Sequence, residues 1–294
     1  MMDSKIRELC LKAYGRNKIA SMCDMPSRWD RFFLQIHSNP DTARAIMDMN
    51  LKRAEEIMKF LQLHQIPAAT DEVLDIGCGS GSVTGKLAGA AKHVTGADIS
   101  EVSRKTAAEY FRSCMISNVD LMFCDINALD PEQAGWINRF DLVFSALTPP
   151  CYNLEVIRKM EAMSRKYCFL EMDLVNMDCP AGELVEQVMG NQTVFSHNRI
   201  RFFQLLNTIL CLEGTFPSVR YYRESCSVEY ENEDEYLQRI LDATFSSEKT
   251  QEQIDQLRTL LRKVKDENGV ISSRRELLTG WILWDVRKDE GIRS

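Results

Sequence analysis

The chain has no apolar run close to the roughly 18 residues that a membrane-spanning helix requires, so we expect no span. It also has no excess of basic charge: 43 Asp and Glu residues stand against 36 Lys and Arg residues, and the net charge is -7. An acidic chain lacks the overall attraction to a nucleic-acid backbone. We therefore expect neither a membrane nor nucleic acid as a partner, while a local basic patch stays open.

Motifs that bind structural metals are missing as well. The ten cysteines are scattered without a CxxC pair, and none of the four histidines lies close in sequence to another. A structural zinc site needs such groups at short spacing, so we expect no metal. Because no secretory signal pattern precedes the cysteines, we expect reduced thiols and a cytoplasmic protein.

What the chain does contain is an apolar fraction of 45% in 294 residues, arranged in two patterns. Up to about residue 68, apolar residues recur at three- and four-residue spacing, which predicts helices. From Glu72 on, short apolar runs alternate with amphipathic stretches, as in βαβ units around a parallel sheet. A short helix is expected around 131–140, and strands are predicted at 73–77, 93–99, 121–125, 141–147, 167–175, 218–230 and 277–286.

The first predicted strand runs into a glycine-rich turn, DIGCGSG, at residues 75–81. A triphosphate loop needs Lys and then Ser or Thr directly after its last glycine, where this chain has Ser82 and Val83. A dinucleotide turn has the spacing GxGxxG, whereas this turn reads GxGxG, with Asp75 two residues before the first glycine. A carboxylate there would repel a pyrophosphate but could hold a ligand's ammonium group.

Asp75, Gly77, Gly79 and Gly81 match the motif E/D-x-G-x-G-x-G of the class I methyltransferases that use S-adenosylmethionine (SAM), which the chain resembles over about residues 70–175. The resemblance implies SAM as cofactor and S-adenosylhomocysteine (SAH) as product. It implies that Asp98, at the end of the second strand, accepts hydrogen bonds from the ribose hydroxyls. It also implies that Asp125, at the end of the third strand, holds the adenine amino group. The cofactor-binding residues expected are Asp75, Gly77, Cys78, Gly79, Gly81, Asp98, Ile99, Asp125, Ile126 and Ser145.

The resemblance also predicts the fold and the division of the chain. We expect an α/β fold with a seven-stranded, mostly parallel sheet and helices on both faces, in which the last strand inserts antiparallel beside the fifth. A helical lid is expected at 1–68 and the SAM-binding domain at 69–294, with a helical insertion at about 181–214. The segment RWDRFF before the core and the Thr-Pro after the fourth strand are similar to a group of bacterial methyltransferases.

The segment LTPPCYN (147–153) follows the fourth predicted strand. Amino-group methyltransferases carry Asn/Asp-Pro-Pro-Tyr there, in which an amide or carboxylate accepts hydrogen bonds from the target nitrogen. Here Thr148 replaces that acceptor and Tyr152 comes one residue late, which puts amide-type chemistry in doubt. Thr148, Tyr152 and His37 are the candidate catalytic residues, and a rigid turn without a catalytic role is the alternative reading.

The segment MPSRWDRFF (25–33) is the expected lid. Arg28 or Arg31 could pair with the SAM carboxylate and Trp29 could form a wall of the pocket. Alternatively, Trp29 and its neighbouring phenylalanines only attach the helix to the sheet. Asp30 is a further candidate base.

The function expected is SAM-dependent methyl transfer to a small-molecule acceptor by in-line displacement, in a monomer or homodimer. Two alternatives stay open: a methyltransferase acting on protein, tRNA or rRNA, and a non-catalytic SAM-binding protein. The stretches HNRIRFFQLL and SVRYYRE mix basic and aromatic residues and would favour an RNA or DNA substrate, against the overall acidity.

Overall fold

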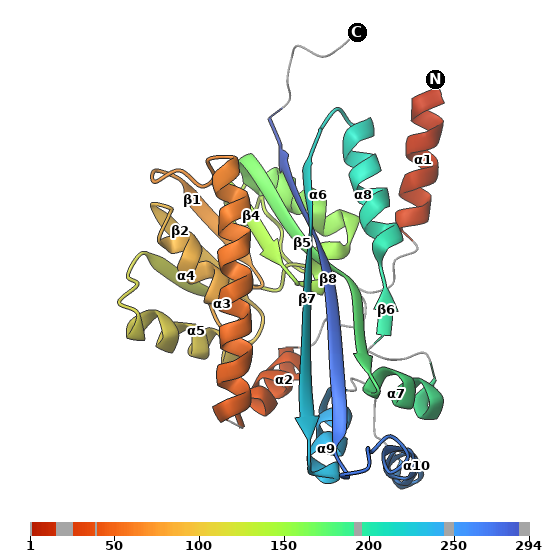
Figure 1. The fold of residues 1–294 in the computed structure, drawn as a ribbon. Coiled ribbons are helices and arrows are strands. Elements are labelled where there is room, and N and C mark those ends of the chain that lie inside the picture. The colour runs from red at the N-terminus through yellow and green to blue at the C-terminus, as the bar shows by residue number, and fades with distance from the viewer. Residues whose placement is uncertain (1, 16–25, 39, 191–195, 244–249, 288–294) are drawn as a thin grey trace. The chain divides into compact units, whose positions relative to one another are not determined.

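The computed structural model describes residues 2–15, 26–38, 40–190, 196–243 and 250–287. A single sheet has the strand order β3-β2-β1-β4-β5-β8-β7, so β1 lies between β2 and β4 (Figure 1). The first four strands are short and parallel, and β5 continues the parallel pairing next to β4. They are β1 (Glu72–Ile76), β2 (His93–Asp98), β3 (Val119–Phe123) and β4 (Phe140–Ala146).

The remaining strands are longer: β5 (Ser164–Cys179), β7 (Ser218–Tyr230) and β8 (Ile271–Asp285). Val286 N donates to Lys166 O and Arg275 Nε donates to Asn176 Oδ1. The residue numbers of β8 decrease where those of their partners in β5 increase. The two strands therefore run antiparallel, as predicted. The short β6 (Ser196–Asn198) pairs antiparallel with β5, and it interrupts the segment that was predicted as a purely helical insertion.

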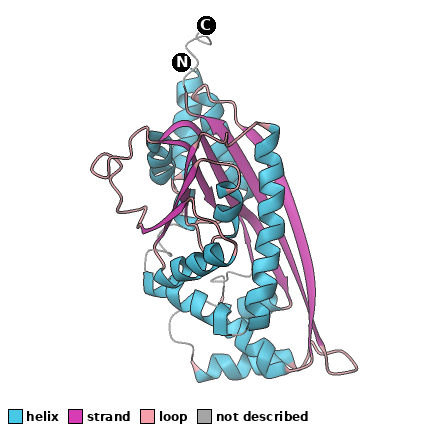
Figure 2. Cartoon of the chain, turned by 90° about the vertical axis from the view of Figure 1, so that its left-hand side faces the viewer, coloured by secondary structure: helices cyan, strands magenta, loops and turns pink. Residues whose placement is uncertain are grey.

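Three N-terminal helices precede the sheet: α1 (Met2–Tyr14), α2 (Pro26–Ser38) and α3 (Pro40–Leu63). Helices α4 (Ser82–Ala88), α5 (Glu101–Ser113) and α6 (Leu154–Met163) connect the parallel strands, and helices flank the strands in Figure 2. The later helices are α7 (Ala181–Met189), α8 (Ile200–Leu212), α9 (Glu233–Ala243) and α10 (Gln251–Leu261). The helix predicted around 131–140 is wrong: the segment forms turns, with Gly135 at a φ of 68°.

The chain divides into two compact units. Unit 1 comprises Met1–Met172, Gln204–Arg220 and Trp281–Ser294, and unit 2 comprises Asp173–Phe203 and Tyr221–Gly280. Strands β5, β7 and β8 contribute residues to both units. The predicted boundary between a lid at 1–68 and a domain at 69–294 stays a prediction.

Each unit has its own core. In unit 1, Phe144 of β4 stacks on Phe169 of β5 with ring centroids 4.6 Å apart, and both side chains are fully buried. In unit 2, the buried residues of α7, α9 and α10 pack around Tyr236 and Leu257. Burial of such large apolar side chains contributes about 1.5–3 kcal/mol each.

Candidate active site

The turn after β1 depends on its three glycines. Gly77, Gly79 and Gly81 have φ angles of 76°, 55° and 87°, in the left-handed region that glycine adopts at little cost. A Cβ on Gly77 would lie 2.0 Å from Oγ1 of Thr148, and one on Gly81 would lie 2.7 Å from the Phe111 ring. The turn is therefore pressed against the loop after β4 on one side and against α5 on the other.

A cleft lies beside this turn, at the carboxyl ends of β1, β2 and β4. It brings together predicted site residues from four loops and from α2: Gly77, Gly79, Asp98, Ile99, Asp125, Ile126, Thr148 and Trp29. The cleft is also lined by Phe33 of the predicted lid and by Leu147, Pro149 and Pro150 of the loop after the fourth strand. Three further lining residues were not singled out from the sequence: Ile76, Cys124 and Asn127. Ligands of open α/β sheets bind at this edge.

Asp98 ends β2 and is connected to two backbone amides. Its Oδ2 accepts a hydrogen bond from Gly79 N at 2.9 Å, and its Oδ1 accepts one from Ser100 N at 2.8 Å. Burial raises the pKa of Asp98, and these two hydrogen bonds counter part of that shift. The carboxylate is thus fixed beside the glycine turn, with lone pairs left for further donors because each oxygen can accept more than one hydrogen bond.

Asp125 lies on the next loop of the cleft, where its Oδ1 accepts a hydrogen bond from Asn127 N at 3.0 Å. Ile126 is buried, and Ile99 lies on the neighbouring loop of the same cleft. The cleft therefore combines two carboxylates with two apolar side chains, which suits a ligand with a flat ring and hydroxyl or amino donors.

The chemical groups of these residues match those that a SAM molecule would need. A Cβ on Gly79 would point into open space, where the nearest protein atom is Gly77 O at 4.0 Å. A ligand can therefore approach the backbone of Gly79 closely. Asp98 can accept hydrogen bonds from ribose hydroxyls, and Asp125 can accept one from an amino group. Ile99 and Ile126 can contact an adenine ring.

Gly79→Ala is expected to lower the affinity for SAH by tenfold or more, because the new methyl group would occupy the space of the cofactor. Gly135→Ala is the matched control: its φ is 68°, no atom lies within 4 Å of the added Cβ, and it does not line the cleft. Both variants should lose about 1–2 kcal/mol of folding stability to the left-handed backbone. Calorimetric titration and thermal melts measure both effects, and equal SAH binding by the two variants would contradict the assignment.

Asp75 is completely buried and does not line the cleft. Its Oδ2 accepts a hydrogen bond from Thr84 Oγ1 at 2.6 Å. Burial raises the pKa of Asp75 to about 7; the Thr84 hydrogen bond and Arg53 act against this shift, and Asp98 adds to it. The structure thus shows a partner within the adjoining helix α4, and contact with a ligand ammonium group stays a prediction.

The raised pKa of Asp75 predicts a pH-dependent stability. The ordinary carboxyl pKa is about 4, so between pH 4 and 7 the folded state binds a proton that the unfolded state releases. Asp75 therefore adds to the free energy of unfolding. This stabilising contribution is fully present below pH 4, decreases as the pH rises, and is lost at about pH 7. Asp75→Asn, which keeps an acceptor for Thr84, should remove it and change the slope by about 1.4 kcal/mol per pH unit. Urea unfolding at several pH values in this range measures the slope of the free energy of unfolding against pH. Asp120→Asn, at an exposed carboxylate, is the control. Identical slopes for Asp75→Asn and wild type would refute the assignment.

Several other predicted residues lie away from the cleft. Cys78 is buried, with its Sγ packed toward Gly96, and burial raises the pKa of its thiol well above the ordinary range, which disfavours a nucleophile. Ser145 is buried, and its Oγ donates to Ile76 O at 3.0 Å. Tyr152 is 1% exposed and does not line the cleft. Arg31 is exposed and does not line the cleft either.

The side chains of Arg28 and His37 lie outside the part of the chain that the structure describes, so their predicted roles stay predictions. Asp30, a candidate base at the sequence level, accepts hydrogen bonds from Ser100 Oγ and Val102 N. Burial tends to raise its pKa, but these hydrogen bonds outweigh it, and the pKa of Asp30 lies below its ordinary value. A carboxylate with a lowered pKa is a poor proton acceptor, so the structure argues against Asp30 as a base.

Sequence reasoning missed a buried network around Glu171. Arg53 Nη1 of α3 donates to Glu171 Oε2 of β5 at 2.6 Å, and Trp281 Nε1 of β8 donates to Glu171 Oε1 at 3.0 Å. Glu171 is paired with Ala146 at the end of β4. The three residues are far apart in sequence, and only the order of the strands brings them together.

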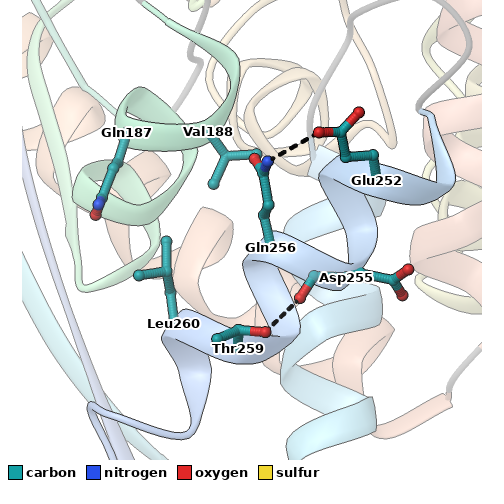
Figure 3. A pocket seen from close by; sticks show the side chains of 7 residues that line it. All are labelled: Gln187, Val188, Glu252, Asp255, Gln256, Thr259 and Leu260. Atoms are coloured by element: carbon teal, nitrogen blue, oxygen red, sulfur yellow. Dashed lines mark hydrogen bonds between the residues drawn. The ribbon is translucent and has the colours of Figure 1, made fainter.

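A second hollow lies in unit 2, between α7 and α10 (Figure 3). It encloses about 570 Å³ and is lined by Gln187, Val188, Glu252, Asp255, Gln256, Thr259 and Leu260. None of the predicted site residues lines it. Among the described residues, no cluster of three or more His, Cys, Asp or Glu side chains could hold a metal ion.

The strand order, the glycine turn and the cleft define a class I methyltransferase fold. Residues 73–180 match the family model described as a methyltransferase domain. These residues thus form a methyltransferase domain, in a chain that has the class I methyltransferase fold. No curated protein matches the sequence significantly.

Two solved structures illustrate the likeness of fold. The YcgJ protein of Bacillus subtilis is 13% identical with a TM-score of 0.52, over 80% of this chain and 100% of that one. A protein of Bacillus halodurans that is named as a methyltransferase is 15% identical with a TM-score of 0.52, over 81% of this chain and 99% of that one. None of the helices within the described residues combines the length and apolar content needed to cross a bilayer.

Proposed function

We propose that this enzyme transfers the methyl group of SAM to a small-molecule acceptor that binds in the cleft beside the loop after β4. The observation that carries the proposal is the convergence of Gly79, Asp98, Asp125 and Thr148 on one cleft. Its remaining walls are mostly apolar, from Trp29 and Phe33 of α2 and from Leu147, Pro149 and Pro150 of the β4 loop. A narrow apolar enclosure favours a small acceptor with an apolar body over a macromolecular chain.

The positions of the side chains support a set of cofactor-binding roles. We assign Asp98 to the ribose hydroxyls, Asp125 to the adenine amino group, and Ile99 and Ile126 to the faces of the adenine ring. SAM supplies an electrophilic methyl group on its sulfonium. The protein has to align an acceptor lone pair with that group and to exclude water.

Among the described side chains, Thr148 is a predicted catalytic residue that lines the cleft. Its Oγ1 donates to Ile76 O at 3.1 Å or to Ala146 O at 3.3 Å, which fixes the side chain at the end of β4. Its oxygen lone pairs can then accept a hydrogen bond from an acceptor O–H or N–H group. We therefore assign Thr148 to orientation of the acceptor.

Two experiments test the proposal. Calorimetric titration of the purified protein with SAH, run beside NADH, should show micromolar binding of SAH alone. Incubation of the enzyme with labelled SAM and fractionated cell extract should then place the label in small molecules. Label found only in protein or RNA would favour the macromolecular alternative, and SAH binding without any turnover would favour the non-catalytic one.

A further inference from the structure

The attachment of α2 to the rest of unit 1 depends on one carboxylate that the proposed function does not use. Asp30 Oδ1 accepts a hydrogen bond from Ser100 Oγ at 2.6 Å and another from Val102 N at 3.2 Å. Asp30 also receives a backbone hydrogen bond from Glu101. All three donors lie at the start of α5, in its N-cap residue and its first turn, 70 to 72 positions away in the sequence.

The start of a helix is where such a carboxylate is most favourable. The first amides of α5 lack partners within their own helix, and the positive end of the helix dipole attracts a negative charge. Ser100 is the N-cap residue of α5 and accepts a hydrogen bond from Ser103 N, and its hydroxyl proton is donated to Asp30. Asp30 thus adds, from a different helix, a second capping group.

This contact lies next to the cleft on both helices. Trp29 directly precedes Asp30, Phe33 lies one turn later on α2, and both side chains line the cleft. On α5, the same Ser100 donates its backbone N–H to Asp98, the carboxylate assigned to the ribose. Ser100 therefore connects Asp30 to Asp98 through two hydrogen bonds.

We propose that Asp30 is a positioning residue that holds α2 over the bound cofactor and so sets how long SAM or SAH stays in the cleft. The inference rests on the proposed function, because it assumes that the cleft binds SAM. When the hydrogen bonds of Asp30 are intact, Trp29 and Phe33 cover the cleft. When they are lost, α2 separates more readily from α5 and the cofactor dissociates faster.

The test measures SAH dissociation by stopped-flow fluorescence of Trp29. This tryptophan is a usable reporter because it lines the cleft, whereas Trp136, Trp281 and Trp284 do not. Asp30→Ala should increase the dissociation rate about tenfold, the effect of losing charge-assisted hydrogen bonds worth about 1.4 kcal/mol. Asp30→Asn keeps a capping oxygen and should give a smaller increase, since Asn and Asp are comparable N-cap residues.

Glu109→Ala is the control, because it removes an exposed carboxylate from α5, the helix whose start Asp30 contacts. It should leave both the dissociation rate and the melting temperature unchanged. An Asp30→Ala variant that releases SAH at the wild-type rate would overturn the inference while leaving the proposed function intact. If Asp30→Ala does not fold, Ser100→Ala takes its place, because it removes the hydroxyl that donates to Asp30. A wild-type dissociation rate for that variant overturns the inference, and a wild-type protein that binds no SAH overturns both proposals.

Discussion

Asp98→Ala is expected to weaken SAH binding by about 100-fold or more. A buried carboxylate that accepts two ribose hydroxyls forms two charge-assisted hydrogen bonds of about 1.5–3 kcal/mol each, and their loss corresponds to at least two orders of magnitude. The position of Asp98 supports this role, because the amides of Gly79 and Ser100 fix both oxygens beside the glycine turn. Calorimetric titration of wild type and variant with SAH measures the loss.

The same substitution removes the acceptor of those two amides, so a ligand control is needed. An SAH analogue that lacks both ribose hydroxyls cannot use the Asp98 carboxylate. It should bind wild type and Asp98→Ala with nearly equal affinity, while SAH itself discriminates strongly between them. If the analogue loses as much affinity as SAH, Asp98 acts by supporting the turn and not by contacting the ribose.

The parallel half of the sheet and its cleft could be predicted because their signals are local. A glycine at a left-handed φ, a carboxylate at the end of a strand and the alternation of strands and helices all occur within a few residues of sequence. The predicted Gly79, Asp98, Asp125 and Thr148 therefore meet at one cleft in the structure. Their individual roles toward the cofactor stay proposals.

The contacts that sequence reasoning missed join segments that are distant along the chain. Asp30 caps a helix 70 residues later, and Arg53 pairs with Glu171, 118 residues away. Asp30 was named for its chemistry as a base, whereas its surroundings give it a capping role. No spacing rule within a single helix or strand points to such partners, since the strand order and the packing of α2 and α3 decide them.

The second large effect is expected on stability. Glu171→Ala should lower the free energy of unfolding by about 3–5 kcal/mol, the cost of removing one partner from a buried ion pair. Glu171 is fully buried, its partner Arg53 is 9% exposed, and the variant would also remove the acceptor of Trp281 Nε1. Urea unfolding followed by circular dichroism measures the change. Asp120→Ala is the control, because that carboxylate is 82% exposed in its pair with His93 and should contribute at most about 1 kcal/mol.

The double variant Arg53→Met, Glu171→Leu separates the cost of an uncompensated charge from the loss of packing. Replacing both partners of a buried ion pair by apolar residues is often neutral, so this variant should be more stable than Glu171→Ala by about 2 kcal/mol or more. Loss of Arg53 would also remove a positive charge that favours the ionised form of Asp75, so the pKa of Asp75 would rise further. Asp75 would then be mainly neutral at pH 7 and add little cost. A double variant as unstable as Glu171→Ala would mean that the shape of these side chains, and not their charge, stabilises this part of the core.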